Sequence, residues 1–479
     1  MLKKGWVLAL AGFFFAFFLF LHWGNFDNFF FQDDFYHLGI SRISSLEGFL
    51  NFFNPWVQQD VHFRPLSTQS FFLIGHLFPL AWAAFALRLV LLGFHLANSY
   101  LVFRLINRFL KRGEMAVVLA GIYLIAPLHF LSLYYISAFQ QILAAFWQLL
   151  GFCFFALNKK NWVYLFFILA LLSKETAFTF PALLLIFSYI IRLEKDPKGY
   201  FLPLKKEWPY WLLLVLIALV YGLVRTVTFA KFPGESYQLS LSFRTLLGSW
   251  RWYLTWLLGA PETIINYAGR LLSFNLEAFL KDGAFWARTF LFTFLAEIAI
   301  VCLIMALSVK RGLGYFWSRL VIGRFFLWSA FFAISLLPVS FFPYHRYAHY
   351  LDLAFFGLLI LAGKLFLEVK IPKLLWGFLL LIFLVNALAS TRVDQKLHWA
   401  IDRSKISQEY FEAFQEDDLC RQKGVYFVDT PALPAREVNI ALFSNWGPAY
   451  FCRYRPLSIY YQGISQPGRE NQFKVVTID

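Results

Sequence analysis

The chain has 479 residues, of which 60% are hydrophobic and 15% are charged. Soluble domains usually carry about 25% charged residues, so the composition excludes an ordinary soluble protein and predicts a polytopic membrane protein. The net charge of +15 does not indicate a nucleic-acid partner, because the basic residues cluster in short segments between apolar runs, as cytoplasmic anchoring segments do. We therefore expect the lipid bilayer as a partner and no nucleic acid.

The first predicted span covers residues 6–23, an uncharged apolar run of 18 residues. At about 1.5 Å per residue, a helix of this length approaches the thickness of a hydrocarbon core of about 30 Å. Lys3 and Lys4 precede the run and place the N-terminus in the cytoplasm. A signal peptide is the competing interpretation, but no small-residue cleavage site follows, so we expect a retained span.

Residues 25–69 form the first predicted outer loop. An acidic charge balance fits a position outside the cytoplasm, and within the loop Asp33 and Asp34 are adjacent. Two neighbouring carboxylates close to lipid are energetically costly unless they are solvated or take part in function, so this pair is the leading candidate for a functional site. The charged residues of the loop are Asp27, Asp33, Asp34, Glu47 and Asp60 against Arg42 and Arg64.

The apolar stretch 162–191 is interrupted by Lys174, Glu175 and Pro181. Charges at the centre of a bilayer are expensive, and the stretch is too short for two ordinary spans with a loop between them. We expect two short, protein-buried helices that meet at an outward-facing Lys-Glu turn.

The remaining apolar runs, separated by basic loops, bring the predicted total to roughly eleven spans, with the N-terminus in the cytoplasm and the C-terminus outside. Residues 230–283 form a second large outer loop with interfacial helices, one of them at residues 250–258. Arg225 and Arg288 fall near the outer ends of their spans, where they reach water. The remaining runs are residues 81–103, 115–133, 138–157, 208–229, 284–308, 325–342, 350–367 and 374–389.

From residue 391 the composition becomes polar and mixed, and residues 391–479 predict a small extracytoplasmic α+β domain. We expect a helix at residues 404–419, a strand at 424–429 and further strand within 446–461. Cys420 and Cys452 lie in this tail. They form a disulfide if the tail lies outside the cytoplasm, and two free thiols are an equal alternative on sequence alone.

Several polar clusters share the predicted outer face. Acids, bases and aromatic residues gathered at a membrane surface suit a charged, membrane-anchored ligand. A carboxylate can act as general base toward an acceptor hydroxyl, and Arg or Lys can stabilise the charge that grows on a departing phosphate. The clusters are Asp33 and Asp34 with His37, His62 with Arg64, Lys174 with Glu175, His345, Arg346 and Tyr347 with His349, and, as a weaker candidate, Glu262.

The order of short motifs resembles the GT-C glycosyltransferases, most closely the protein O-mannosyltransferases and their bacterial relatives. The resemblance covers residues 1–390, which we expect to be the transmembrane glycosyltransferase domain. No nucleotide-sugar domain is visible, which favours a lipid-carried donor. The motifs are the Asp-Asp pair after the first span, Arg-Pro-Leu at 64–66, Ser-Lys-Glu at 173–175 and the Arg-Tyr at 346–347 ahead of a late span.

The resemblance implies a polyprenyl-phosphate sugar donor, an extracytoplasmic acceptor and an active site on the outer face, here of a prokaryotic plasma membrane. It implies Asp33 as catalytic base, with Asp34 as its partner or as the base instead, and a reaction with inversion, by analogy with inverting hydrolases. Metal dependence varies across the superfamily, so no cofactor or metal ligand is assigned and a divalent metal stays open. The donor-phosphate contacts would be Arg346, Lys174, Arg64 and His345, and the other site candidates are Glu175, His37, Tyr347 and Glu262.

Each motif also has a purely structural alternative. Asp33 and Asp34 suit a solvated loop or a helix N-cap, Lys174 and Glu175 an internal ion pair, residues 344–350 an interfacial aromatic belt, and Arg64 a brace for its loop. Arg88 and His95, seven residues apart, are expected to be buried packing contacts. The rival function is a transporter or flippase of lipid-linked saccharides, which would favour ionisable groups deep within several spans and related halves. A third alternative is a non-catalytic membrane scaffold.

Overall fold

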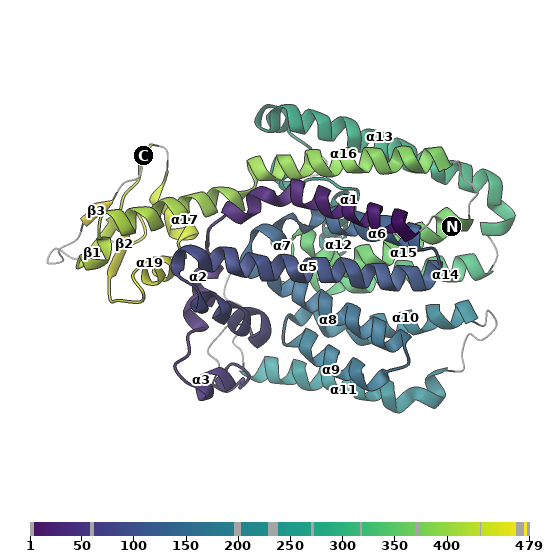
Figure 1. The fold of residues 1–479 in the computed structure, drawn as a ribbon, viewed down its shortest axis with the longest axis horizontal. Helices are drawn as coiled ribbons and strands as arrows, with labels where there is room; N and C mark the ends of the chain where they lie inside the picture. The colour runs from purple at the N-terminus through teal and green to yellow at the C-terminus, as the bar shows by residue number, and fades with distance from the viewer. Residues whose placement is uncertain are drawn as a thin grey trace.

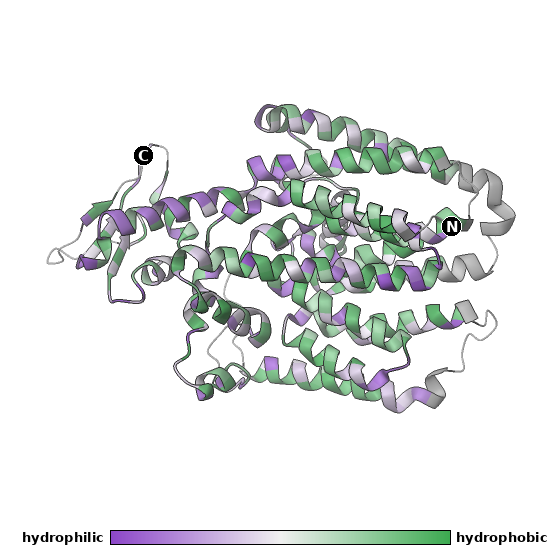
Figure 2. Ribbon diagram, in the orientation of Figure 1, coloured by the Kyte–Doolittle hydropathy of each residue, from purple (hydrophilic) through white to green (hydrophobic). Residues whose placement is uncertain are grey.

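The structure is a computed structural model that describes residues 4–57, 62–195, 203–228, 238–269, 273–316, 319–368, 373–431, 433–465 and 474–476. Long helices lie side by side in a bundle, and the N-terminus and the C-terminal elements lie at opposite ends of the molecule (Figure 1). The bundle helices are mainly hydrophobic along their length, whereas the C-terminal elements carry more hydrophilic residues (Figure 2). This distribution fits a multi-pass membrane protein.

Eight helices in the described ranges are long and apolar enough to cross a membrane, or nine if the pair Gly113–Ile125 and Pro127–Tyr134, bent by 44°, is one span. The predicted total of eleven is therefore not confirmed. Two further apolar helices, Lys160–Leu171 and Phe325–Val339, are shorter. A 12-residue helix rises only about 18 Å, less than a hydrocarbon core of about 30 Å.

The bundle helices lie at the predicted apolar runs, but several extend beyond them. Their bounds are α1 (Lys4–His22), α5 (Leu80–Leu110), α6 (Gly113–Ile125), α7 (Phe130–Tyr134), α8 (Phe139–Ala156), α9 (Lys160–Leu171), α10 (Phe180–Lys195), α11 (Pro203–Thr228), α13 (Leu276–Phe316), α14 (Arg319–Leu336), α15 (Asp352–Glu368) and α16 (Lys373–Leu397). Helix α5 continues to Leu110, past the predicted end at residue 103, and α13 begins at Leu276, within the predicted outer loop 230–283.

Short elements connect the bundle helices and carry most of the polar clusters. They are η1 (Trp23–Asp27), α2 (Asp33–Ile40), α3 (Leu46–Asn51), η2 (Pro65–Ser70), α4 (Phe71–Leu73), η3 (Ile74–Leu77), η4 (Pro127–His129), η5 (Ile136–Ala138), η6 (Glu175–Thr179), α12 (Phe243–Leu257), η8 (Glu262–Tyr267), η9 (Leu337–Val339) and η10 (Ala348–Leu351). Asp60 and the predicted outer-loop residues 230–237 and 270–272 lie outside the described residues.

The interrupted stretch 162–191 forms two helices on either side of the Lys-Glu turn, as predicted, but they are only partly buried, since Trp162, Leu165 and Ile168 of α9 are exposed. Helix α9 ends at Leu171, and α10 begins at Phe180, with the short helix η6 and Lys174 between them. The two helices thus meet at the Lys-Glu turn, although the second half, Glu175–Leu193, is long enough to span a membrane by itself.

Helix α16 continues to Leu397, eight residues beyond its predicted end at residue 389. The extension is polar, but Ser390 and Asp394 within it are buried and hydrogen-bonded. Ser390 Oγ donates to the Gly259 carbonyl oxygen at 2.6 Å, and Asp394 accepts from the Glu262 N–H at 2.9 Å. Polar residues can continue a buried helix when other segments satisfy them, which the apolar pattern does not reveal.

The C-terminal segment packs a three-stranded parallel sheet, in the order β2-β1-β3, against helices. The strand predicted within residues 446–461 is present at Ser458–Tyr461, whereas Trp446–Phe451, at the start of that range, is helical. Pro448 has no N–H for a sheet ladder but is tolerated in the first turn of a helix, and Tyr450 and Phe451 are buried. The elements are α17 (Trp399–Glu416), η11 (Leu419–Arg421), β1 (Gly424–Phe427), α18 (Ala435–Ala441), α19 (Trp446–Phe451), β2 (Ser458–Tyr461) and β3 (Lys474–Val476).

The C-terminal segment also packs on the acidic loop that precedes α2. The rings of Phe29 and Phe411 stack with centroids 4.9 Å apart, and the Phe29 N–H donates to Ser404 Oγ at 2.7 Å. Gly39 of α2 lies against the Trp446 ring, with no room for a Cβ. The tail is therefore bound tightly to the loop that carries the candidate acids.

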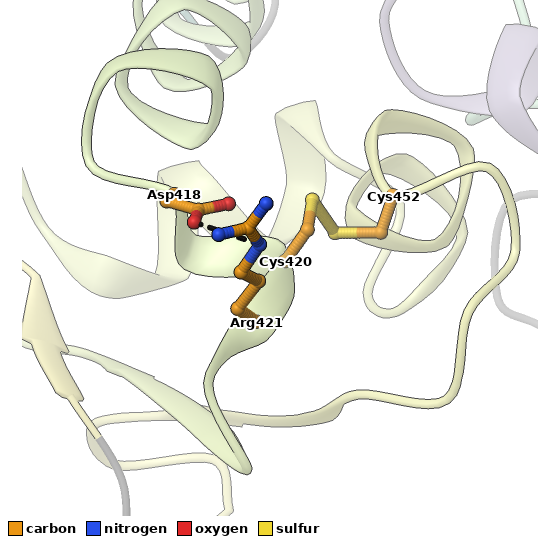
Figure 3. The surroundings of a disulfide bond; sticks show 4 residues. All are labelled: Asp418, Cys420, Arg421 and Cys452. Atoms are coloured by element: carbon orange, nitrogen blue, oxygen red, sulfur yellow. Dashed lines mark ion pairs between the residues drawn. A yellow bond between two sulfur atoms is a disulfide. The ribbon is translucent and has the colours of Figure 1, made fainter.

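Cys420 and Cys452 form a disulfide with their Cα atoms 5.2 Å apart (Figure 3). The sequence leaves open a disulfide or two free thiols, and the structure contains the disulfide. Next to it, Arg421 Nε lies 3.0 Å from Asp418 Oδ2. The bond ties η11, at the end of α17, to the residue after α19, and so braces the elements that contact α2.

We predict that the double substitution Cys420→Ala and Cys452→Ala lowers the free energy of unfolding of the C-terminal segment. The cysteines are separated by 32 residues, and the loop-closure entropy for that length corresponds to about 3–4 kcal/mol. Pulse proteolysis in denaturant measures the change. Cys302→Ala is the control, since Cys302 is an exposed free cysteine. Equal protease resistance of the double variant and the control would contradict the prediction.

Candidate functional site

A cavity of about 300 Å³ lies where α2, η6 and the segment before α15 meet. We call it the site cavity. It brings together most of the residues that the sequence singles out from distant segments, together with residues that it does not. Its polar and aromatic lining consists of Asp33, His37, His62, Arg64, Tyr135, Ser137, Gln140, Lys174, Glu175, Thr176, Arg225, Phe342, His345, Tyr347, His349, Tyr350 and Trp399.

Asp33 and Asp34 occupy the first turn of α2. The partial positive charge at a helix N-terminus stabilises carboxylates there. Gln32, the residue before them, has φ 50° and ψ −126°, a backbone conformation that non-glycine residues rarely adopt. Its N–H donates to the Ala441 carbonyl oxygen at 2.7 Å, so the C-terminal segment helps to hold the strained turn that aims the acids.

Asp34 is fully buried and turned away from the site cavity. Its Oδ1 accepts from the Ser137 N–H at 2.8 Å and from Ser137 Oγ at 2.5 Å, and its Oδ2 accepts from the Phe31 N–H at 3.2 Å. Burial raises the pKa of Asp34 to about 7, although the hydrogen bonds from Ser137 and Phe31 oppose the rise. Asp34 therefore ties α2 to η5 and positions its neighbour.

Asp33 is half-buried and lines the site cavity. Its N–H donates to the Tyr135 hydroxyl at 3.2 Å. Burial, followed by the charges of Asp33 and Asp34, raises the pKa of Tyr135 well above its usual range, so Tyr135 keeps its proton at neutral pH. Of the two adjacent acids, Asp33 is the one placed to contact a ligand in the cavity.

Arg64 and Glu175 form a two-point ion pair in the wall of the site cavity. Arg64 Nε donates to Glu175 Oε2 at 2.7 Å, and Arg64 Nη2 donates to Glu175 Oε1. Arg64 Nη1 also donates to Gln140 Oε1. This geometry matches the bidentate pairing that arginine favours, and it agrees with the bracing role that the sequence leaves open for Arg64.

Lys174 is buried, and its Nζ lies 4.7 Å from the centroid of the Tyr350 ring. Burial and then the charge of Arg64 lower the pKa of Lys174 to about 7, against the opposing effect of Glu175. Burial and then the charge of Lys174 lower the pKa of His345 to about 4. Near neutral pH, His345 is therefore uncharged, and Lys174 is present in both its protonated and its neutral form.

The charge in the site cavity favours an anion. When Lys174 is protonated, three cationic side chains face two carboxylates in the lining, which leaves one positive charge in excess. Burial lowers the pKa of His37 to about 3, so this histidine is a neutral hydrogen-bonding group. The charged residues are Arg64, Lys174 and Arg225 against Asp33 and Glu175.

Besides Asp34, two predicted site residues lie outside this lining. Arg346 is half-buried, and its Nε donates to Ser249 Oγ of α12 at 3.0 Å. Glu262 is buried and accepts from the Ala348 N–H at 3.4 Å. Burial, followed by the charge of Asp394, raises the pKa of Glu262 well above its usual range. Both residues brace the segment that carries Tyr347 and His349 rather than lining the cavity.

The sequence did not single out Tyr135, Gln140 or Trp399 as site residues. Tyr135 lies in the outer turn between two predicted spans, and Gln140 lies at the start of the second of these spans. Their position near the outer face was the signal that could have identified them as site residues. Trp399 follows the last span once α16 is extended to Leu397. Among the described residues, no group of three or more His, Cys, Asp or Glu is placed to hold a metal ion.

Arg88 and His95 have the structural roles expected of them. Arg88 is fully buried, and its guanidinium donates to the carbonyl oxygens of Asn28, Phe29 and Tyr134 at 3.0–3.2 Å. His95 bonds to the Leu124 carbonyl oxygen at 3.0 Å. Arg88 thus fixes the chain leading into α2.

The sequence matches no protein-family model and no curated protein. Function is therefore inferred from the residues of the site cavity themselves.

We predict that Glu175→Gln lowers the free energy of unfolding by about 3 kcal/mol, because it leaves the buried Arg64 guanidinium without its carboxylate. Chemical denaturation in mixed micelles measures the difference. Glu47→Gln is the control, since it removes the same charge from an exposed position on α3. A loss for Glu175→Gln no larger than that for Glu47→Gln would show that the ion pair is not needed for stability.

Proposed function

We propose that the protein is an integral membrane glycosyltransferase that moves a sugar from a polyprenyl-phosphate donor to an extracytoplasmic acceptor. The observation that carries the proposal is the placement of Asp33, on the first turn of a helix, in one cavity with Lys174 and Arg225 at the end of an apolar bundle. A lipid-anchored phosphate can reach such a cavity with its chain in the bilayer and its head group among the cations.

Asp33 acts as the general base in this proposal. It removes the proton from an acceptor hydroxyl while the acceptor oxygen forms a bond to the anomeric carbon of the donor sugar. The bond between that carbon and the phosphate oxygen breaks, and its electron pair leaves with the carrier phosphate. Attack opposite the leaving group inverts the anomeric centre. Asp34 is a positioning residue, because its oxygens are occupied by Ser137 and Phe31.

Lys174 and Arg225 stabilise the departing phosphate in this proposal. Preorganised cations in a cavity stabilise developing negative charge more strongly than cations in water do. Arg64 contributes to the field of the cavity while bonded to Glu175, and His345 is a neutral donor. Arg346, which the resemblance implies as a phosphate contact, is assigned a bracing role through Ser249.

An outer-face location is part of the same proposal. The Cys420–Cys452 disulfide suits an oxidising compartment, and the acidic loop lies with the C-terminal elements at the end opposite the N-terminus (Figure 1). With the N-terminus in the cytoplasm, the site cavity would open to the outside of a prokaryotic plasma membrane.

We expect Asp33→Asn to reduce sugar transfer by 10²- to 10⁴-fold, the usual contribution of a general base, without changing the unfolding midpoint. The assay follows release of carrier phosphate by purified protein in lipid nanodiscs, offered a panel of polyprenyl-phosphate sugars. Asp27→Asn is the matched control, since Asp27 is an exposed acid of the same loop and should retain wild-type turnover.

Normal turnover by folded Asp33→Asn would exclude Asp33 as the base. Passage of labelled lipid-linked saccharide across the bilayer, with no donor consumed, would replace the enzyme by the transporter alternative.

We predict that affinity for the donor decreases as pH rises through about 7. The pKa of Lys174 is lowered to about 7, so its cationic form is lost above that pH, whereas the phosphodiester of the donor keeps one negative charge. Binding of a polyprenyl-phosphate sugar between pH 6 and pH 9 measures the effect, with at most tenfold weakening per pH unit for one proton.

Lys174→Arg separates this effect from the titration of Asp34, because arginine stays charged throughout the range. The arginine variant should bind the donor with little pH dependence. An unchanged pH profile in Lys174→Arg would assign the titration to another group.

A further inference from the structure

We propose that the acceptor is a saccharide, whose pyranose ring stacks on an aromatic wall beside Asp33. The wall consists of Tyr135, Tyr347 and Trp399. This inference rests on the proposed function and names the class of its acceptor.

The wall is a compact unit with a buried backing. Tyr135 stacks on the buried ring of Phe31 with centroids 4.7 Å apart and planes at 20°. Trp399 meets Tyr135 edge to face at 5.9 Å. The three wall residues remain partly exposed and line the site cavity. Large aromatic side chains thus face a cavity that also holds carboxylates and cations, rather than being covered by protein.

The Tyr135 end of the wall lies next to the base, whereas its Tyr347 end lies toward the proposed phosphate contacts, with the Tyr347 ring 4.8 Å from the ring of His345. Tyr135 accepts the Asp33 N–H at 3.2 Å, whereas Lys174 rests on the ring of Tyr350. The general base must touch the acceptor hydroxyl, so a ligand group packed on Tyr135 is the acceptor rather than the carrier phosphate.

The chemistry of the wall matches one face of a pyranose. The ring C–H groups of a sugar are weakly positive, and the face of an aromatic ring is negative, so the two surfaces attract while excluding water. Hydroxyl groups at the sugar edge need hydrogen-bonding partners in the same cavity. Asp33, the Tyr135 hydroxyl, Gln140 and His349 line it. An apolar face with polar groups at its edge is the usual form of a small-ligand site.

The C-terminal segment supplies and holds Trp399, the first residue of α17. One turn later, Arg403 lies over its ring with Cζ 4.9 Å from the centroid. Ser404 then bonds to the backbone of Phe29, shortly before the acids. The tail thus sets the distance between the aromatic wall and Asp33, which gives it a role in recognising the acceptor.

The first experiment measures saccharide binding without turnover. Full-length protein in lipid nanodiscs is titrated with methyl α-mannopyranoside, methyl β-glucopyranoside and methyl N-acetyl-β-glucosaminide, and binding is followed by saturation-transfer NMR. At least one glycoside should bind, and Trp399→Ala should weaken it about tenfold, while Trp399→Phe should keep much of the affinity because a ring face remains. Trp6→Ala, at an exposed position on α1, should match the wild type.

A second arm distinguishes the two sources of a pyranose, the acceptor and the donor sugar. The glycoside should still bind when the cavity holds a polyprenyl-phosphate sugar. Displacement of the glycoside by the donor, with equal weakening of both ligands in Trp399→Ala, would assign the wall to the donor sugar and overturn the acceptor proposal. Absence of glycoside binding by the wild type would overturn it too, as would transfer to serine or threonine peptides at a rate that Trp399→Ala does not change.

Failure of this inference is separable from failure of the proposed function, because carrier-phosphate release tests the enzyme class independently. If carrier phosphate is released only when Asp33 is present, but saccharide binding does not depend on Trp399, the glycosyltransferase proposal stands and the saccharide acceptor is rejected.

Discussion

The hydrogen bonds of Asp34 to Ser137 are the contacts on which the site cavity depends. They join the first turn of α2 to η5, two segments about a hundred residues apart in sequence. A buried carboxylate without partners would be strongly unfavourable, so the donors from Ser137 and Phe31 make its burial tolerable. With Asp34 fixed inside, the helical repeat turns Asp33 toward the cavity. Asp34 thus has a structural role, and Asp33 is the acid that faces the cavity.

The same rule governs the other charges at this end of the bundle. Arg64 is buried against Glu175 and Gln140, and Arg88 is buried among backbone carbonyl oxygens. Each guanidinium is placed so that several of its N–H groups donate hydrogen bonds, as a buried ion requires. Lys174 is different, because its ammonium group lies over the aromatic ring of Tyr350. Burial and then the charge of Arg64 lower the pKa of Lys174, so a bound anion would favour its protonated form.

The C-terminal segment belongs physically to the site. Its helix α17 begins with Trp399 in the cavity lining, and the carbonyl oxygen of Ala441 holds the strained turn at Gln32. The disulfide then fixes the end of α17 to the end of α19. The segment has buried apolar residues of its own, such as Phe427 and Phe451. It gains further stability by packing on phenylalanine rings of the acidic loop, and the loop gains a defined conformation in return.

The sequence by itself determined the membrane class, the approximate position of the apolar helices and the importance of the acid pair. These follow from local composition, because a bilayer demands long uncharged runs and makes isolated carboxylates costly. It also located the Lys-Glu turn and nine of the residues that line the cavity, namely Asp33, His37, His62, Arg64, Lys174, Glu175, His345, Tyr347 and His349. The helix extension through Asp394, the helix at Trp446–Phe451 and the wall residues Tyr135 and Trp399 were not predictable in this way, since their partners are distant in sequence. Only the tertiary structure decided which acid faces the cavity. It also decided that Arg64 is paired with Glu175 and that Arg346 lies outside the cavity lining. The physical reason is that the partners of a buried charge come from segments brought together by packing, and not from residues adjacent in sequence.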